Sequence, residues 1–501
     1  MLRRIDPLGP LFALVSVGVF LAHGFNGTLS RDLALYSYSG EQLADGVPPY
    51  VSVLNRAGPL AHVVPGIGSI LAGWFGKDDV LTQRFLMMIL SVLTVWVIYL
   101  VGRDLFRSKS AGAIAATTLL TVQGFMTFAT GGPREKTTMM LLMALALWAI
   151  LHQRWGWAGA FVALATLTWQ PAFALGFAAA VAAVSYRRED KPLRSIGWIC
   201  LGGAIPTALT VIAFTLAGAL KPLINCFLLI NLHYTRQGGI IEFLRDKSSA
   251  LVHGYGPSLV VLAVGLPAAV ITAIVLLSRP GWRDDPRARA RIGFGVGIVV
   301  ALLSSLKTFN GWPDALFMTP VAVVTFAGLV HELVRRVPGT KAVAAVTAAY
   351  CVLVLAFAGF NAVHTSNDRL VAQRGAVRAV LHVTGQDASI VSIAAPAPLV
   401  LAHQTNPVQY QMFKNGFDAY VDDVYPGGLK GLATHLVGLE PTIFTVDSQV
   451  YFPWIIPQMK QDYVRIGRSA DAAWWVRRDL GAAKISRLRT AMHHYLLQEQ
   501  S

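Results

Sequence analysis

Long apolar runs occupy most of the first 361 residues, and short polar segments separate them. A helix needs about 17 to 25 mostly apolar residues to cross a bilayer. We therefore predict a mainly α, polytopic membrane protein with about eleven transmembrane helices. The apolar runs lie at residues 8–25, 84–102, 110–129, 137–151, 156–169, 171–185, 195–217, 257–278, 292–307, 315–334 and 342–361. The two runs around Trp169-Gln170-Pro171 also fit one long helix kinked by the proline.

Basic residues gather in every second connection between these runs. Arg103, Arg107 and Lys109 lie in the first such connection, and Arg335 and Arg336 lie in the last. Because Lys and Arg in short loops are retained in the cytoplasm, this alternation predicts a cytoplasmic N-terminus. It places on the outer, non-cytoplasmic side of the membrane the segments 26–83, 131–136, 219–256, 307–314 and everything after residue 362.

Composition supports this class of protein. The chain is 54% hydrophobic and 14% charged, whereas soluble domains carry roughly a quarter charged residues. The net charge of +15 comes from loops between apolar runs, so it indicates topology and membrane lipids rather than nucleic acid. Three cysteines without a CxxC spacing imply neither a disulfide framework nor a Cys-based zinc site. High Ala, Gly and Arg content favours a bacterial inner (plasma) membrane, with a periplasmic outer side.

The last 140 residues change in character, because polar residues increase and long apolar runs end. Short apolar segments at Ser389–Ala394 and Pro441–Val446 predict buried strands, with a helix at Gly428–Val437 between them. A final strand pair is predicted at Tyr463–Ile466 and Ala473–Arg477. We therefore divide the chain into a membrane domain, 1–361, and a small extracytoplasmic α/β domain, 362–501.

The first outer loop, residues 26–83, is too long for a simple connector. Ser30 is a candidate N-cap for a helix that ends at the Gly46-Val47-Pro48-Pro49-Tyr50 stop signal. The Gly-rich apolar stretch Pro59–Phe75 is too interrupted for a span and predicts a second helix along the membrane surface.

Short motifs follow one another in this loop and beyond it. They are Arg31–Tyr36, Leu43–Tyr50, Arg56–Leu60, Gly76 with Arg84, Gly102–Phe106, Thr168–Pro171, and Asn310–Asp314 with Met318–Pro320. Their order resembles that in the GT-C glycosyltransferases that use polyprenyl-phosphate sugars, a superfamily that includes mannosyl, arabinosyl and aminoarabinose transferases. The resemblance covers most of the chain.

The resemblance implies a hexosyl- or pentosyltransferase. Its donor would be a polyprenyl-phosphate-linked sugar, and its acceptor a hydroxyl of a glycan, lipid or protein at the outer membrane face. It also implies inversion at the anomeric carbon and a general base at Asp32. A carboxylate beside the bilayer suits this role, because a low dielectric raises its pKa toward neutral pH. The alternative is that Asp32 serves only as a first-turn helix acid, favoured by the helix dipole.

The leaving phosphate requires cationic partners. Arg56 and Arg84 are candidates because Arg binds phosphate oxygens with two nitrogens, although outer Arg residues also bind lipid headgroups. Further candidate substrate ligands are Tyr36, Lys307, Asp314, Tyr234 and Arg236. Tyr234 and Arg236 belong to a polar cluster with Asn231 and His233, for which the alternative is an interfacial Tyr beside a snorkelling Arg.

Glu135 lies between two cationic residues, Arg134 and Lys136, at the start of a predicted span. It is a candidate to hold a divalent cation, Mg²⁺ or Mn²⁺, together with Asp32, or to orient the acceptor. Its two neighbours are candidates to pair with phosphate. The alternative is that all three are helix-start charges in the headgroup zone. No other cofactor is expected.

Two other functions fit the same composition. One is a polysaccharide polymerase or ligase that uses a pyrophosphate-linked glycan and needs no base at Asp32. The other is a non-catalytic lipid or glycan transporter. No Walker-type phosphate loop occurs, and the apolar runs carry few ionisable residues, so ATP-driven and ion-coupled transport are not indicated. His403, Tyr410 and Tyr451 of the tail are candidates to shape an acceptor cleft.

Overall fold

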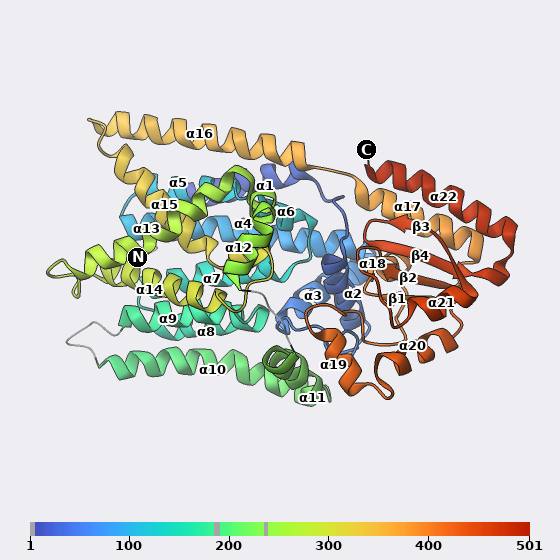
Figure 1. Ribbon diagram of the computed structural model, residues 1–501. Helices are drawn as coiled ribbons and strands as arrows, with labels where there is room; N and C mark the ends of the chain where they lie inside the picture. Colours follow the sequence, from blue (N-terminus) through green and yellow to red (C-terminus); the bar gives the residue numbers. More distant parts are fainter. Residues whose placement is uncertain (1–5, 185–190, 235–238, 501) are drawn as a thin grey trace.

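The computed structural model describes residues 6–184, 191–234 and 239–500, and Figure 1 shows a helix bundle with a small sheet at one end. Helices dominate, so the prediction of a mainly α chain is confirmed. The helices of the first part are α1 (Leu8–His23), α2 (Arg31–Ala44), α3 (Leu60–Phe75), α4 (Asp79–Phe106), α5 (Lys109–Leu120), α6 (Gln123–Gly131), α7 (Glu135–Leu151), α8 (Trp155–Thr168), α9 (Ala172–Val184), α10 (Pro192–Leu216), α11 (Leu220–Leu223), the π-helix η1 (Ile224–Tyr234), α12 (Ile240–Tyr255), the 3₁₀ turn η2 (Gly256–Ser258), α13 (Leu259–Leu277), α14 (Pro286–Ser305), the 3₁₀ turn η3 (Trp312–Phe317), α15 (Thr319–Val334) and α16 (Thr340–Thr365).

The predicted spans coincide with helices of this bundle, and the run 110–129 coincides with two, α5 and α6, which meet at 67°. By length and composition, five helical segments of the described chain can cross a bilayer, or six if this bent pair counts as one. Five further apolar helices, α1, α3, α8, α9 and α15, are shorter. The number of eleven spans therefore stays a prediction, whereas a chain with several membrane-crossing helices is supported.

Two helix breaks have local causes. Between α5 and α6, the Thr121 hydroxyl donates to the carbonyl of Thr118 at 2.7 Å, and Val122 is extended. Between α8 and α9, Trp169 is extended, with φ −155° and ψ 116°, and Pro171 offers no backbone N–H. The alternative of one kinked helix through Trp169 is therefore wrong.

The predicted inner and outer segments separate to opposite ends of the bundle. At one end, Asp6 pairs with Arg103 at 3.4 Å and with Lys109 at 3.4 Å, and Arg287 donates to the carbonyl of Asp104. At the other end lie α2, α3, η1 and the sheet (Figure 1). This separation agrees with the alternation of basic loops; the assignment of one end to the cytoplasm stays a prediction.

The first outer loop folds into α2 and α3, which pack on each other closely. A Cβ at Gly40 would lie 2.8 Å from the carbonyl carbon of Pro65, so the contact requires glycine. Ser30 occupies the predicted N-cap position, but its side chain makes no capping hydrogen bond. Instead, the backbone N–H of Arg31 donates to the carboxylate of Asp471 at 3.0 Å. The start of α2 is thus capped by a distant part of the chain.

The C-terminal part contains a four-stranded sheet in the order β1-β2-β4-β3. β1 (Ile390–Ile393) and β2 (Ile443–Asp447) are parallel, whereas β4 (Ala472–Arg477) is antiparallel to β2 and to β3 (Tyr463–Ser469). The four strands lie where the sequence predicted them. The remaining elements are α17 (Arg369–Thr384), α18 (Ala397–Ala402), α19 (Phe417–Val424), α20 (Gly428–Gly438), α21 (Ile456–Asp462), the 3₁₀ turn η4 (Arg478–Leu480) and α22 (Ala482–Gln500).

Side chains alternate between the two faces of this sheet, and both faces are covered. Trp474 and Val476 pack with residues of α17 and α22, whereas Phe444 and Val446 pack with residues of α20 and α21. In Figure 1, α17 and α22 lie above the strands, and α20 and α21 lie below them. Helix α16 runs to Thr365, four residues beyond the predicted boundary at 361.

Polar and apolar contacts join the sheet region to the bundle. The Tyr38 hydroxyl accepts from the backbone N–H of Asn406 at 2.9 Å, and Arg374 pairs with Asp78 at 2.6 Å. Tyr50 and Phe413 share one apolar cluster. The two parts therefore pack as one unit, with α2 and α3 between them.

Candidate functional site

A cavity of about 510 Å³ opens where the outer loops meet the C-terminal domain. It lies between the first turn of α2, the start of α7, the α8–α9 break and the turn η3. Its lining includes Arg31, Asp32, Tyr36, Asn55, Arg56, Arg134, Glu135, Lys136, Trp169, Gln170, Asn231, Asn310, Asp314, Met412, Lys414 and Asn415. Five of the predicted site residues, and the two candidate phosphate partners Arg134 and Lys136, thus share one cavity; the five are Asp32, Tyr36, Arg56, Glu135 and Asp314.

Asp32 lies in the first turn of α2 with its carboxylate between two arginines. Arg134 contacts Asp32 Oδ2 at 2.8 Å, and the guanidinium of Arg31 contacts Oδ1 at 3.1 Å. The Asp32 side chain is 36% exposed, and it lines the cavity. A molecule in the cavity therefore has access to this carboxylate.

The charge state of Asp32 differs from the expectation. Burial in the protein does favour the protonated form, but the charges of Arg134 and Arg31 outweigh it and hold the pKa of Asp32 well below its usual value. The expectation that a low dielectric raises this pKa toward neutral is wrong, because it ignored the two cations. The lowered pKa keeps the Asp32 carboxyl ionised at neutral pH.

Glu135 begins α7 and is almost completely buried. Its carboxylate contacts Arg134 at 3.1 Å and Lys136 at 3.2 Å. Arg134 therefore lies between the carboxylates of Asp32 and Glu135 and pairs with both. A divalent cation shared by these two acids would have to displace the Arg134 guanidinium, so the two acids as arranged fit a cation poorly.

Arg56 provides a cation with one nitrogen that lacks a hydrogen-bond partner in the described part of the chain. Its Nη1 atom is buried and has no hydrogen-bond partner within the described residues. Its backbone is held by Gln170 and Asn231, whose amides donate to the Arg56 carbonyl at 2.7 and 3.1 Å. Burial lowers the pKa of Arg56, while Asp314 opposes this change. An anion that enters the cavity would supply the hydrogen-bond acceptor that this guanidinium lacks.

Lys136 and Asp314 also line the cavity. Lys136 Nζ lies 3.3 Å from Asp314 and 2.9 Å from the ring centre of Trp169. Asp314 accepts the backbone N–H of Asn310 at 2.8 Å, which fixes the loop before η3. The Trp169 ring that covers Lys136 comes from the α8–α9 break, so this break positions a cation of the site.

Other predicted residues lie outside the cavity lining. Arg84 is buried and donates to backbone carbonyls of Phe25, Gly27 and Gly132, so it joins the end of α1 to the loop before α7. Lys307 is exposed and does not line the cavity. Tyr234 packs edge-on against Tyr420, with 5.1 Å between ring centres.

Arg236 lies outside the described residues. His403, Tyr410 and Tyr451 do not line this cavity.

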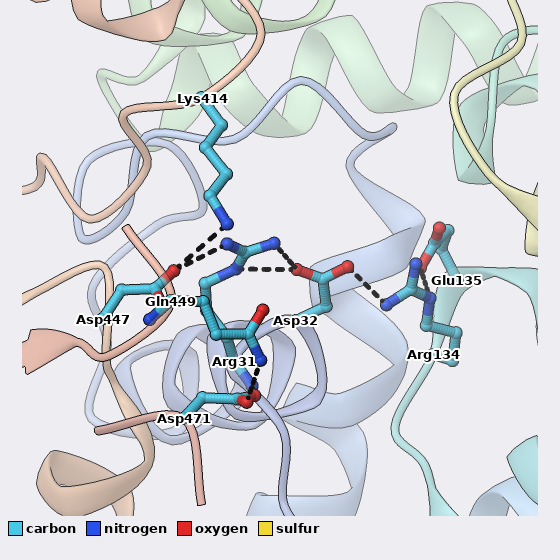
Figure 2. A network of polar contacts seen from close by, with 8 residues as sticks. All are labelled: Arg31, Asp32, Arg134, Glu135, Lys414, Asp447, Gln449 and Asp471. Atoms are coloured by element: carbon cyan, nitrogen blue, oxygen red, sulfur yellow. Dashed lines mark hydrogen bonds and ion pairs between the residues drawn. The ribbon is translucent and has the colours of Figure 1, made fainter. Parts of the chain in front are cut away.

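Several charged residues that the structure brings to the site were not predicted from the sequence. Figure 2 shows a chain of ion pairs from Lys414 through Asp447 and Arg31 to Asp32, and on to Arg134 and Glu135. Arg31 was part of a quoted motif but received no role. Lys414 and Asp447 carry no local signal, because only tertiary packing brings them near Asp32.

One group of metal-ligand side chains is present within the described ranges, and it lies away from this cavity. Ligand atoms of Glu41, Asp79 and His403 lie within 4.8 Å of one another. None of the three lines the cavity around Asp32.

The chain is similar to known proteins in part of its sequence and in its fold. Residues 64–214 match the family described as dolichyl-phosphate-mannose-protein mannosyltransferase. No curated protein sequence matches the chain significantly. ArnT from Cupriavidus metallidurans, in its apo state, has a similar structure, with a TM-score of 0.64 and 13% identity over 95% of this chain and 98% of ArnT.

Two further solved structures are similar. ArnT from the same organism bound to undecaprenyl phosphate gives a TM-score of 0.64 with 14% identity, and again covers 95% and 98% of the two chains. The oligosaccharyltransferase of Archaeoglobus fulgidus, solved with a tethered acceptor peptide, gives 0.53 with 14% identity over 93% of this chain and 73% of that one. The resemblance to GT-C glycosyltransferases is thus confirmed for the fold.

Proposed function

We propose that this protein is a membrane glycosyltransferase that moves a sugar from a polyprenyl-phosphate donor to an acceptor hydroxyl. One observation carries the proposal: Asp32 and Arg56 line the same cavity, and within the described residues the buried Nη1 atom of Arg56 has no hydrogen-bond partner. A base for the acceptor and a cation for the leaving phosphate are the two groups that this reaction requires.

In the proposed reaction, the acceptor oxygen attacks the anomeric carbon of the sugar while Asp32 takes the hydroxyl proton. The bond from that carbon to the phosphate oxygen breaks, and its electron pair stays on the polyprenyl phosphate. Arg56 and Lys136 stabilise the charge that develops there. Attack from the face opposite the leaving group inverts the anomeric configuration.

The low pKa of Asp32 is compatible with this role. A carboxylate that is always ionised at neutral pH needs no prior deprotonation, and it receives the proton late, as the new bond makes the hydroxyl acidic. Arg31 and Arg134 keep Asp32 ionised while it lies beside the anionic donor.

Three features of the setting support a polyprenyl-linked donor at the outer face. The cavity lies at the predicted outer end of the bundle, the structurally similar ArnT was solved with undecaprenyl phosphate, and loops at both ends follow the expected charge alternation. The proposed location is the bacterial inner membrane, with the C-terminal domain in the periplasm. The acceptor is a glycan, lipid or protein; a peptide acceptor occurs with the similar oligosaccharyltransferase.

The test uses the full chain in lipid nanodiscs with undecaprenyl-phosphate-linked mannose, arabinose or aminoarabinose and a cell-envelope extract as acceptor. Mass spectrometry measures the undecaprenyl phosphate released, a product common to all three donors. We expect release with one donor and a loss of at least 100-fold in Asp32→Asn. Asp462→Asn is the matched control, because Asp462 is an exposed carboxylate of the C-terminal domain.

Unchanged release in a folded Asp32→Asn variant would exclude Asp32 as the general base, whereas no release from any of the three donors by the wild type would favour the ligase or transporter functions. EDTA treatment tests the divalent cation in the same assay. Because Arg134 lies between Asp32 and Glu135, we expect release to persist after chelation.

A further inference from the structure

The C-terminal domain reaches the catalytic carboxylate through two aspartates. Asp447 is the last residue of β2, and Asp471 immediately precedes β4. Since Asp447 pairs with Ala472 in the sheet register, both carboxylates lie at the same edge. This edge meets the first turn of α2 (Figure 2).

Arg31 is held at three points by this edge and by Asp32. Its backbone N–H donates to Asp471 Oδ2 at 3.0 Å, and its Nη1 donates to Asp447 Oδ2 at 2.9 Å. Its Nε and Nη2 both donate to Asp32 Oδ1, at 3.2 and 3.1 Å. One planar guanidinium therefore links the C-terminal domain to the base with a fixed geometry.

The aspartates are themselves fixed. Asp447 is only 2% exposed, accepts the backbone N–H of Gln449 at 2.8 Å, and lies 3.4 Å from Lys414 Nζ. The side chain of Gln449 donates to Asp471 at 2.9 Å. A buried carboxylate with this many partners has little freedom to move, so Arg31 rests on a rigid support.

We propose that Asp447 and Asp471 are positioning residues, which hold Arg31 so that Arg31 keeps the Asp32 carboxylate in its reactive position. The C-terminal domain thereby controls the base although neither aspartate touches the acceptor. This inference rests on the proposed function of Asp32.

Within the described residues, Arg31 and Arg134 are the two cations that contact the Asp32 carboxylate directly. The charged and titratable groups around Asp32 are Arg31 and Tyr36 of α2, Arg56, Arg134, Glu135 of α7, and, beyond Arg31, Asp447 and Lys414. Among the residues that the structure describes, loss of Arg31 leaves Arg134 as the only direct cationic contact of Asp32, so the pKa of Asp32 should rise.

The first experiment is a double-mutant cycle of Arg31→Gln and Asp447→Asn in the nanodisc assay. We expect each single change to lower kcat by about 10- to 100-fold, as small misplacements of catalytic groups do, with KM within about twofold. The double variant should lose no more than Arg31→Gln alone, because Asp447 acts through Arg31. Asp479→Asn, an exposed acid that pairs with Arg477 on the same domain, should keep full activity.

A second measurement does not depend on sugar transfer. An apolar carbodiimide labels only protonated carboxyl groups, and peptide mass spectrometry quantifies its addition to Asp32 as a function of pH. We expect more labelling of Asp32 at pH 4 in Arg31→Gln than in the wild type, and unchanged labelling in Asp479→Asn. If Asp447→Asn does not fold, Asp447→Glu keeps the charge, and we expect it to lower kcat about threefold or more with an unchanged thermal unfolding midpoint.

The outcomes separate the two proposals. Wild-type kcat in a folded Asp447→Asn variant, together with an inactive Asp32→Asn variant, overturns the positioning role and leaves the proposed function intact. An active Asp32→Asn variant overturns the proposed function instead. In that case the labelling experiment is the remaining test of the Arg31–Asp32 contact. Unchanged labelling of Asp32 in Arg31→Gln contradicts this contact.

Discussion

Replacing Arg134 by glutamine should destabilise the protein in a way that depends on pH. Arg134 is 14% exposed and pairs with Asp32 at 2.8 Å and with Glu135 at 3.1 Å. Coulomb's law at 3.1 Å, with an effective dielectric constant of about 20, gives about 5 kcal/mol for the Arg134–Glu135 pair alone. Because water and neighbouring groups compensate in part, we expect Arg134→Gln to lose about 3 kcal/mol of unfolding free energy at pH 8.

The sign of the pH dependence follows from the direction of the shifts. In the wild type, Arg134 helps to hold the pKa of Asp32 below its unfolded value, so this stabilisation is present at neutral pH and is lost as the pH falls through the folded pKa. In the variant, Asp32 and Glu135 repel each other without their shared cation. One of them then gains a proton as the pH falls, so the deficit relative to wild type should shrink between pH 8 and pH 4.

Unfolding of both proteins in the same detergent at pH 4, 6 and 8 provides the assay. Arg335→Gln is the control, because its ion pair with Glu332 is exposed to solvent, and its loss should leave the free energy of unfolding nearly unchanged. A deficit in Arg134→Gln that equals this control, or that stays constant across the pH range, would refute the reasoning.

Three more changes test separate parts of the structure. Arg56→Gln should raise KM for the lipid donor about tenfold or more and Arg56→Lys less, because lysine keeps the charge without the planar fork; equal KM values in steady-state assays contradict this. Burial and nearby carboxylates raise the pKa of Glu41 to about 9, so its ionisation opposes folding as the pH rises above the unfolded value. Glu41→Gln should therefore raise the thermal unfolding midpoint at pH 8 but not at pH 4, and equal gains at both would exclude the effect. A Cβ at Gly58 would lie 2.0 Å from the Leu167 carbonyl oxygen, so Gly58→Ala should cost about 1–3 kcal/mol, whereas Gly73→Ala, with open space, should be neutral or stabilising; chemical denaturation compares the two.

The helices and strands could be predicted because each depends on local patterns. Long apolar runs such as 84–102 became helices, and short apolar segments such as Pro441–Val446 became buried strands. Thr121 and Val122 are an exception. The apolar run 110–129 did not predict the break between α5 and α6, because a threonine side chain that bonds to its own helix carries no hydropathy signal.

The sequence predicted which residues of the candidate site lie close together only where they belong to loops on the same side of the membrane. Asp32, Arg56 and Glu135 come from outer loops, and outer loops meet at one end of a bundle, so their shared cavity was within reach of sequence reasoning. Arg84 also begins a span on the outer side, but it faces backbone carbonyls of neighbouring segments. Which way a side chain turns from its helix depends on packing that hydropathy does not record.

The partners of Arg31 were beyond prediction for a different reason. Asp447 and Asp471 belong to strand ends that face α2 only after the C-terminal domain docks. The expected pKa of Asp32 had the wrong direction for the same cause, since Arg134 lies 102 residues away in the chain. Burial by itself predicts only the effect of desolvation on the pKa of Asp32, because it leaves out the neighbouring charges.

The separation of these partners along the chain has a consequence for biosynthesis. Arg31 precedes Asp447 by 416 residues and Asp471 by 440 residues. During synthesis, the first outer loop is complete long before the last strands leave the ribosome, so the Arg31 contacts can form only when nearly the whole polypeptide has been made and inserted. In a nascent or truncated polypeptide that lacks the last strands, Arg31 therefore has neither Asp447 nor Asp471 as a partner.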